Sequence, residues 1–276
     1  MSLSIKIHAN SEINRDELIS FLDLKINDLK LIQKTEDLFY FYVAEKSLRG
    51  VDFEKQKNTY EILRLSMFSE ADELICRQIF LFAQQTQEDC KFYLDDEPIT
   101  FDDLMNLPLV DFKDDLRSIQ LLASQLGKTI SFYGPLEKFH FGPKVFSKID
   151  TEKEGWENHL VDIAYRVLYE LKDPSGDYVL SAGEGENMKL VKMINSETSY
   201  VIRKFDYLIF LTENETEDER EIIAVTNEDL NNFLPDSWEL ADEYTIVAPA
   251  LSPVEYRQLV KKLIPFDQSN ELAEKD

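Results

Sequence analysis

The chain has 276 residues and a formal net charge of −24, because 54 aspartates and glutamates outnumber 30 lysines and arginines. Such an excess of carboxylates repels the phosphates of nucleic acids and of anionic membranes. We therefore expect a protein that binds neither nucleic acid nor membrane. Strong acidity keeps a protein soluble, and it also suits a partner that is itself basic.

Cysteine usage and the N-terminal residues bear on the compartment. Cys76 and Cys90 are the only cysteines, which is too few for a disulfide framework in a chain of this length. The opening residues contain no apolar run of signal length, and no stretch approaches the ~18 apolar residues that span a membrane. These features predict a cytoplasmic location.

Hydrophobic periodicity predicts many short strands among fewer helices. Strands are expected over residues 3–8, 27–33, 38–43, 59–67, 92–94, 129–133, 137–145, 178–182, 188–194, 205–212, 221–225 and 244–248. Helical stripes occupy residues 14–24, 69–85, 116–126 and 156–171, and shorter helices follow Thr226 and Ser252. The clearest helix starts are Asn14, Ser69 followed by Asp72, and Ser252 followed by Pro253 and Glu255.

The order of these elements indicates the fold class. Hairpins and helices alternate irregularly and no long βαβ series occurs, which favours an α+β fold over a doubly wound α/β fold. We expect mainly antiparallel sheets with helices packed on one face, in two halves of similar size. The charged stretch 149–155 marks the boundary, so the predicted domains are residues 1–150 and 151–276.

The candidate site lies around His140, one of three histidines. In a strand over residues 137–145, Lys138 and His140 point to one face and the flanking phenylalanines to the other. Together with Lys144 and with Arg49 from an earlier turn, they predict a small site for an anion or a partner. The competing interpretation is a half-exposed strand with a solvated histidine, since no acid or serine stands next to His140 as a catalytic partner.

Two short motifs in the first half resemble a bacterial family known only as a domain of unknown function. They are Ser47-Leu48-Arg49-Gly50, with the strand and helix that follow, and Phe141-Gly142-Pro143-Lys144-Val145. The resemblance implies a bacterial protein, and it implies no activity and no site.

Motifs that carry other chemistry are missing. Gly183-Glu184-Gly185-Glu186 lacks the third glycine and the lysine of a phosphate loop, so it predicts a turn. The acidic pairs do not follow the calcium-loop pattern, and the histidines lack zinc spacing. We expect no cofactor, no metal and no catalytic residue.

Two functions follow from this pattern. The first is a non-catalytic module that binds or regulates another protein, in particular a basic one. The second is a small-molecule-binding protein or enzyme with a site near His140 between the two halves. An acidic mask for a nucleic-acid-binding partner is a special case of the first, and it requires one continuous acidic face.

Overall fold

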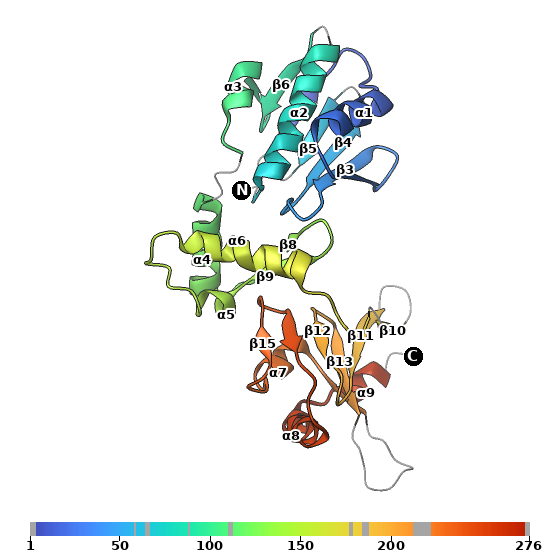
Figure 1. Ribbon diagram of the computed structural model, residues 1–276, viewed down its shortest axis with the longest axis vertical. Coiled ribbons are helices and arrows are strands. Elements are labelled where there is room, and N and C mark those ends of the chain that lie inside the picture. The colour runs from blue at the N-terminus through green and yellow to red at the C-terminus, as the bar shows by residue number, and fades with distance from the viewer. Residues whose placement is uncertain are drawn as a thin grey trace. The chain divides into compact units, whose positions relative to one another are not determined.

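The computed structural model describes residues 4–57, 59–63, 67–87, 89–109, 113–176, 179–183, 188–211 and 222–273. The chain forms two compact units, Met1–Tyr169 and Glu170–Asp276 (Figure 1). Both contain helices and mainly antiparallel sheets, so the predicted α+β fold is confirmed.

A seven-stranded antiparallel sheet, whose strands are not in sequence order, forms the centre of the first unit. Its strands run in the order β2-β3-β4-β5-β1-β6-β7, and every neighbouring pair is antiparallel. The strands are β1 (Ile5–His8), β2 (Leu29–Gln33), β3 (Leu38–Val43), β4 (Val51–Gln56), β5 (Thr59–Leu63), β6 (Lys91–Leu94) and β7 (Glu97–Ile99). Strand β1 therefore lies between β5 and β6, far from β2 in the sheet, although only α1 separates β1 from β2 in the chain.

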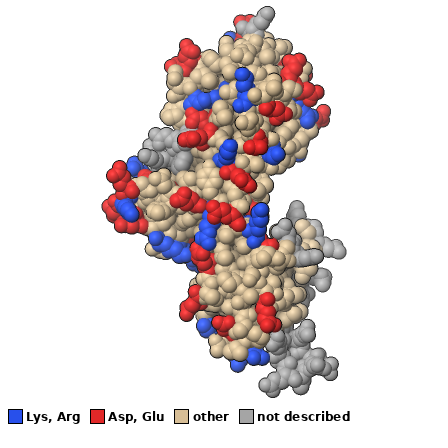
Figure 2. Space-filling view, in the orientation of Figure 1, with Lys and Arg blue, Asp and Glu red and all other residues tan. Residues whose placement is uncertain are grey.

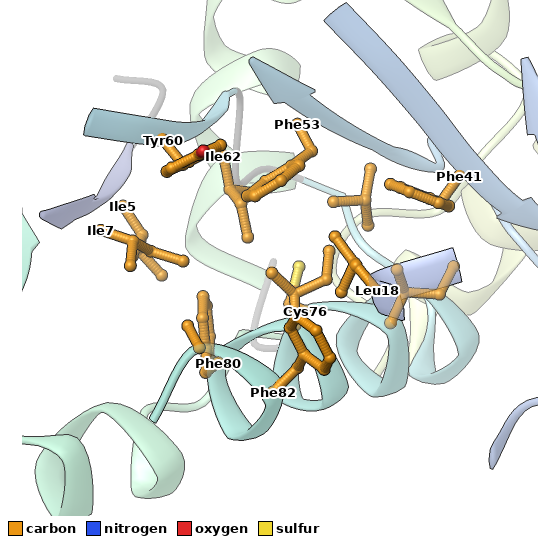
Figure 3. Close-up of a cluster of buried hydrophobic side chains, with 14 of the residues drawn as sticks. Ile5, Ile7, Leu18, Phe41, Phe53, Tyr60, Ile62, Cys76, Phe80 and Phe82 are labelled. Carbon is orange, nitrogen blue, oxygen red and sulfur yellow. The ribbon is translucent and has the colours of Figure 1, made fainter. Parts of the chain in front are cut away.

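Two helices, α1 (Arg15–Lys25) and α2 (Glu70–Thr86), pack on one face of this sheet (Figure 1). Alternate strand residues and the apolar side of α2 meet in a single core. Figure 3 shows part of this core, with Ile5, Ile7, Leu18, Phe41, Phe53, Tyr60, Ile62, Cys76, Phe80 and Phe82 labelled. The helix start predicted at Asn14 is confirmed, since its side chain accepts hydrogen bonds from the N–H groups of Asp16 and Glu17.

The remainder of the first unit is a two-stranded hairpin with helices around it. It contains α4 (Lys113–Leu126), β8 (Ile130–Tyr133), β9 (Lys138–Phe141), α5 (Pro143–Phe146) and α6 (Trp156–Tyr165). Helix α3 (Phe101–Asn106), which precedes these elements in the chain, packs against α2 and β6 of the seven-stranded sheet. The strand predicted over residues 137–145 is too long. It ends at Phe141, because Pro143 occupies the first turn of α5, where its missing N–H costs nothing.

The second unit has two small sheets. One has the order β10-β11-β13-β14 and the other β12-β16-β15, and only β11 and β13 pair in parallel among the described strands. The strands are β10 (Leu180–Ala182), β11 (Lys189–Ile194), β12 (Tyr200–Ile202), β13 (Tyr207–Leu211), β14 (Ile222–Val225), β15 (Glu239–Leu240) and β16 (Ile246–Ala248). The helices are α7 (Asn227–Asn231), α8 (Pro253–Leu263) and α9 (Ser269–Ala273).

Helix α6 explains where the first unit ends. It continues as a π-helical segment, Arg166–Glu170, and two of its tyrosines donate hydrogen bonds to backbone carbonyls of the β3–β4 turn: Tyr165 to Lys46 and Tyr169 to Ser47. The predicted boundary after residue 150 precedes α6 and falls inside this unit. The units are also unequal in length, with the longer one first. The Gly183–Glu186 turn lies partly outside the described residues.

Candidate functional site

A buried carboxylate holds the Ser47–Gly50 loop between β3 and β4. Asp72, which is fully buried near the start of α2, accepts hydrogen bonds from the N–H groups of Leu48 (3.0 Å), Arg49 (3.1 Å) and Gly50 (2.9 Å). It also completes the capping box with Ser69. Charge-assisted hydrogen bonds of this kind are about twice as strong as neutral ones. The loop is therefore fixed to the first turn of α2.

Tyr40 braces the same loop from β3. Its hydroxyl donates to the carbonyl of Arg49 at 2.6 Å, and its ring lies against Gly50. Gly50 has φ of +65°, and a Cβ at this position would come within 2.5 Å of the Tyr40 ring. Only glycine accommodates both the left-handed backbone and this contact. Burial, followed by the charges of Asp72 and Asp52, raises the pKa of Tyr40, so the hydroxyl stays protonated as a donor.

The β8–β9 turn packs against this loop from the other side. A Cβ on Gly134 would lie 3.0 Å from the carbonyl oxygen of Leu48, so glycine permits the close approach. Across this contact, Arg49 Nε donates to the carbonyl of Tyr133 at 3.1 Å, and the Arg49 guanidinium lies 5.4 Å from the centre of the Phe132 ring. Arg49 is thus held by backbone and side chain together.

These contacts place Arg49 at the wall of a cavity of about 230 Å³, which we call the Arg49 cavity. It is lined by Ile32, Lys34, Tyr40, Arg49, Gly50, Asp52, Tyr133, Gly134 and Pro135. Lys34 Nζ lies 2.6 Å from Asp52 Oδ1 and 4.1 Å from the centre of the Tyr40 ring. Two cations and one carboxylate give the cavity a net positive charge, so it suits an anionic group.

The predicted site residues do not all meet here. Lys138 pairs with Tyr133 across the hairpin, and its Nζ lies 4.6 Å from the Tyr133 ring centre, so it lies beside the cavity wall. Lys144 belongs to α5 instead of β9, so it does not continue the row of Lys138 and His140 as the sequence predicts. The structure therefore brings both Arg49 and Lys138 to Tyr133, Arg49 to its carbonyl and Lys138 to its ring.

His140 is buried, with 4% of its surface exposed. It lies opposite Ser131 in the hairpin, and Ser131 Oγ lies 2.8 Å from His140 Nδ1. The sequence places no hydroxyl next to this histidine, because the two residues meet only through pairing of β8 with β9. A serine hydroxyl that is hydrogen-bonded to an imidazole nitrogen is the smallest arrangement that can act as a nucleophile with its general base. The same hydrogen bond also occurs between neighbouring strands with a purely structural role.

The cysteines are poor nucleophiles. Burial raises the pKa of the Cys76 thiol well above its usual value, and burial raises the pKa of Cys90 to about 11. Thiols with such pKa values are protonated at neutral pH. Within the described ranges, no three His, Cys, Asp or Glu side chains come together as metal ligands. In the same residues, every helix is too short or too polar to cross a bilayer.

Several residues in and around the cavity carry no local sign of a site in the sequence. Lys34 falls between the predicted strands 27–33 and 38–43, and Tyr40 falls within the second of them, so neither position indicates a site. Asp72 does not line the cavity, and the sequence predicts it only as part of the helix start at Ser69, although its side chain is fully buried. Asp52 and Tyr133 carry no such sign, because strand pairing alone brings them to the cavity.

Acidic side chains do not form one continuous face in Figure 2. On the surfaces of the two units that this view shows, Asp and Glu are interspersed with Lys and Arg. On these surfaces, nothing resembles the uninterrupted acidic face that masking of a nucleic-acid-binding partner requires.

Comparison with known proteins adds no family. No protein-family model, no curated protein and no solved structure matches this chain. The resemblance of the first half to a bacterial domain of unknown function stays a prediction.

Proposed function

We propose that this protein is a non-catalytic module that binds another protein through the Arg49 cavity. The observation that carries the proposal is the way in which Arg49 is presented. Asp72, Tyr40 and Tyr133 fix its backbone and its side chain beside a cavity that has a positive charge in a strongly acidic protein. A rigidly held arginine loses little conformational entropy on binding, which is typical of residues that dominate interfaces.

Electrostatics would select the partner in two ways, at long range through net charge and on contact through the Arg49 cavity. The net charge of −24 attracts a basic protein at long range. The Arg49 cavity instead selects an anionic group at contact, since a guanidinium pairs with a carboxylate through two parallel hydrogen bonds. A partner that is basic overall and inserts one acidic side chain satisfies both conditions. We propose a bacterial cytoplasm as the setting.

Affinity purification from the native host tests the proposal. The wild-type protein, Arg49→Ala and Arg15→Ala serve as baits. Arg15 is the matched control because it also carries one positive charge, and its guanidinium lies over Phe39, on the core side of the sheet. We expect one protein to co-purify with the wild type and with Arg15→Ala, and to bind Arg49→Ala roughly 10- to 100-fold more weakly.

Two results would count against the proposal. One is the absence of any protein that co-purifies specifically with the wild type. The other is equal capture by the wild type and Arg49→Ala, which would place the binding surface elsewhere.

The bond between Ser131 and His140 favours a second candidate, a small-molecule-binding protein or enzyme with its site at His140. As an enzyme, the protein would use Ser131 Oγ to attack an acyl carbon while His140 Nδ1 takes the hydroxyl proton. The bond from the acyl carbon to its leaving group then breaks, and the leaving group receives that proton. A fluorophosphonate probe, which reacts with activated serines, decides between the two candidates. Labelling of the wild type that disappears in Ser131→Ala would support an enzyme, and absence of labelling would leave the binding module.

A further inference from the structure

Strand β2 forms an edge of the seven-stranded sheet, and no other described strand pairs with its outer side. The hydrogen bonds of the β2–β3 hairpin show which groups face outward. Lys34 N donates to Leu38 O and Ala44 N to Asp28 O, so the even-numbered residues of β2 bond to β3. The N–H and C=O groups of Leu29, Leu31 and Gln33 therefore point away from the sheet, where an added strand would pair with them.

The two faces of β2 differ in chemistry. Leu29 and Leu31 are half-buried and pack against the core of the first unit. Lys30, Ile32 and Lys34 have their side chains on the opposite face, and the last two line the Arg49 cavity. A strand added to this edge would place alternate side chains beside the core and beside the cavity.

Charge complementarity selects the strand. Lys30, Lys34, Arg49 and Lys138 lie on or beside the cavity face, and Asp52 is the acid that lines the cavity. Lysines on an edge strand discourage pairing with a second copy of β2, because antiparallel pairing would bring lysines together. The same lysines favour a strand that carries acidic residues on that face.

We infer that the partner segment is an extended strand of alternating apolar and acidic residues, which pairs with the free edge of β2. Its acidic side chains lie against Lys30 and Lys34, and one carboxylate reaches Arg49. Its apolar side chains extend the core beside Leu29 and Leu31. This inference rests on the proposed protein-binding function and names the recognition element of the partner.

The test uses a fluorescent peptide of alternating valine and glutamate that is long enough to span β2, and a valine–lysine peptide of equal length. The full-length protein, Gln33→Pro and Gln33→Thr are titrated by fluorescence anisotropy. Proline removes the outward N–H and is tolerated on an edge strand, whereas threonine keeps the N–H. We expect the acidic peptide to bind the wild type and Gln33→Thr at least tenfold more tightly than Gln33→Pro.

Hydrogen exchange provides a measurement that needs no variant. The acidic peptide should slow exchange of the amides of Leu29, Leu31 and Gln33 in the wild-type protein. Unchanged exchange at these amides, equal affinity for Gln33→Pro and Gln33→Thr, or tighter binding of the lysine peptide would each overturn the inference.

The two proposals fail separately. Capture of a host protein that depends on Arg49 but not on the N–H of Gln33 would retain the binding module and exclude strand addition. If no host protein co-purifies specifically with the wild type, the proposed function is overturned, whether or not the acidic peptide binds.

Discussion

Gly50 shows how the choice of one residue shapes the candidate site. It combines a left-handed backbone with direct contact to the Tyr40 ring. Gly127 also has a left-handed backbone, with φ of +61°, but a Cβ there would meet no atom within 4 Å. The two glycines therefore separate the cost of the backbone conformation from the cost of the contact.

Alanine substitutions at these positions measure both costs. We expect Gly127→Ala to lower the free energy of unfolding by about 1 kcal/mol, because alanine is strained in the left-handed region. Gly50→Ala should lower it by about 3 kcal/mol, since the clash adds to that strain. Urea denaturation measures both values. Equal effects would show that Tyr40 moves aside freely.

Tyr40 predicts a dependence of stability on alkaline pH. Burial and the nearby charges of Asp72, Asp52 and Tyr169 raise its pKa above the ordinary value of 10.0, while Arg49 opposes them. Above about pH 10 the folded state retains a proton that the unfolded chain loses. The contribution of Tyr40 to stability is therefore constant below about pH 10 and falls as pH rises further, by about 1.4 kcal/mol per pH unit.

The variant Tyr40→Phe isolates that contribution. It should cost about 1 kcal/mol at neutral pH, because the bond to the Arg49 carbonyl is lost. Above pH 10 its free energy of unfolding should fall less steeply than that of the wild type. Denaturation at a series of pH values checks this, and parallel curves would contradict it. Tyr165 and Tyr169 also have raised pKa values, so part of the alkaline loss persists.

At the level of elements, the turn before β10 depends on a buried ion pair. Lys192 on β11 is 3% exposed, and its Nζ donates to Asp173 Oδ2 at 2.7 Å, to Ser175 Oγ and to the Gly176 carbonyl. Burial by itself would raise the pKa of Asp173, but hydrogen bonds from Lys192 and Ser175 outweigh it and the pKa is lowered. The pair ties the turn to the sheet of the second unit.

Removal of one partner from this pair should be severe. Lys192→Met leaves Asp173 without its countercharge, and we expect the free energy of unfolding at neutral pH to fall by about 3 kcal/mol or more. The double variant Lys192→Met with Asp173→Asn should recover part of the loss, since no unpaired charge is then buried. Urea denaturation compares the three proteins. A double variant no more stable than Lys192→Met would show that the charge itself is not the cause.

At the level of the whole molecule, the two compact units raise the question of where the first one ends. The contacts of Tyr165 and Tyr169 with the β3–β4 turn assign α6 to it. Trp156 and Leu160 of this helix are also buried. A fragment that stops at residue 150 would lack all four side chains.

Two fragments test this assignment. Residues 1–169 should unfold in one cooperative transition, and residues 1–150 should melt at least about 10 °C lower, because they lose both tyrosine bonds and the buried face of α6. Circular dichroism against temperature compares them. Equal melting temperatures would support the boundary at residue 150 that the sequence predicts.

The amino-acid sequence by itself determined the α+β class and the helix starts at Asn14, Ser69 and Ser252. It also determined the alternation of apolar and polar side chains along a strand such as β1. These features depend on neighbours within a few residues, since periodicity and capping act locally. It also singled out Arg49. The prediction for Lys144 is wrong, because the predicted strand runs through Pro143, whereas β9 ends at Phe141 and Pro143 begins α5.

Only the tertiary structure decided the surroundings of Arg49 and His140. Lys34, Asp52 and Tyr133 join Arg49, and Ser131 meets His140, through strand pairing and packing between segments far apart in the chain. Asp72 reaches back to hold the loop before β4 for the same reason. Such contacts depend on which strands become neighbours, and this is set by burial of the whole core, which no local pattern of residues records.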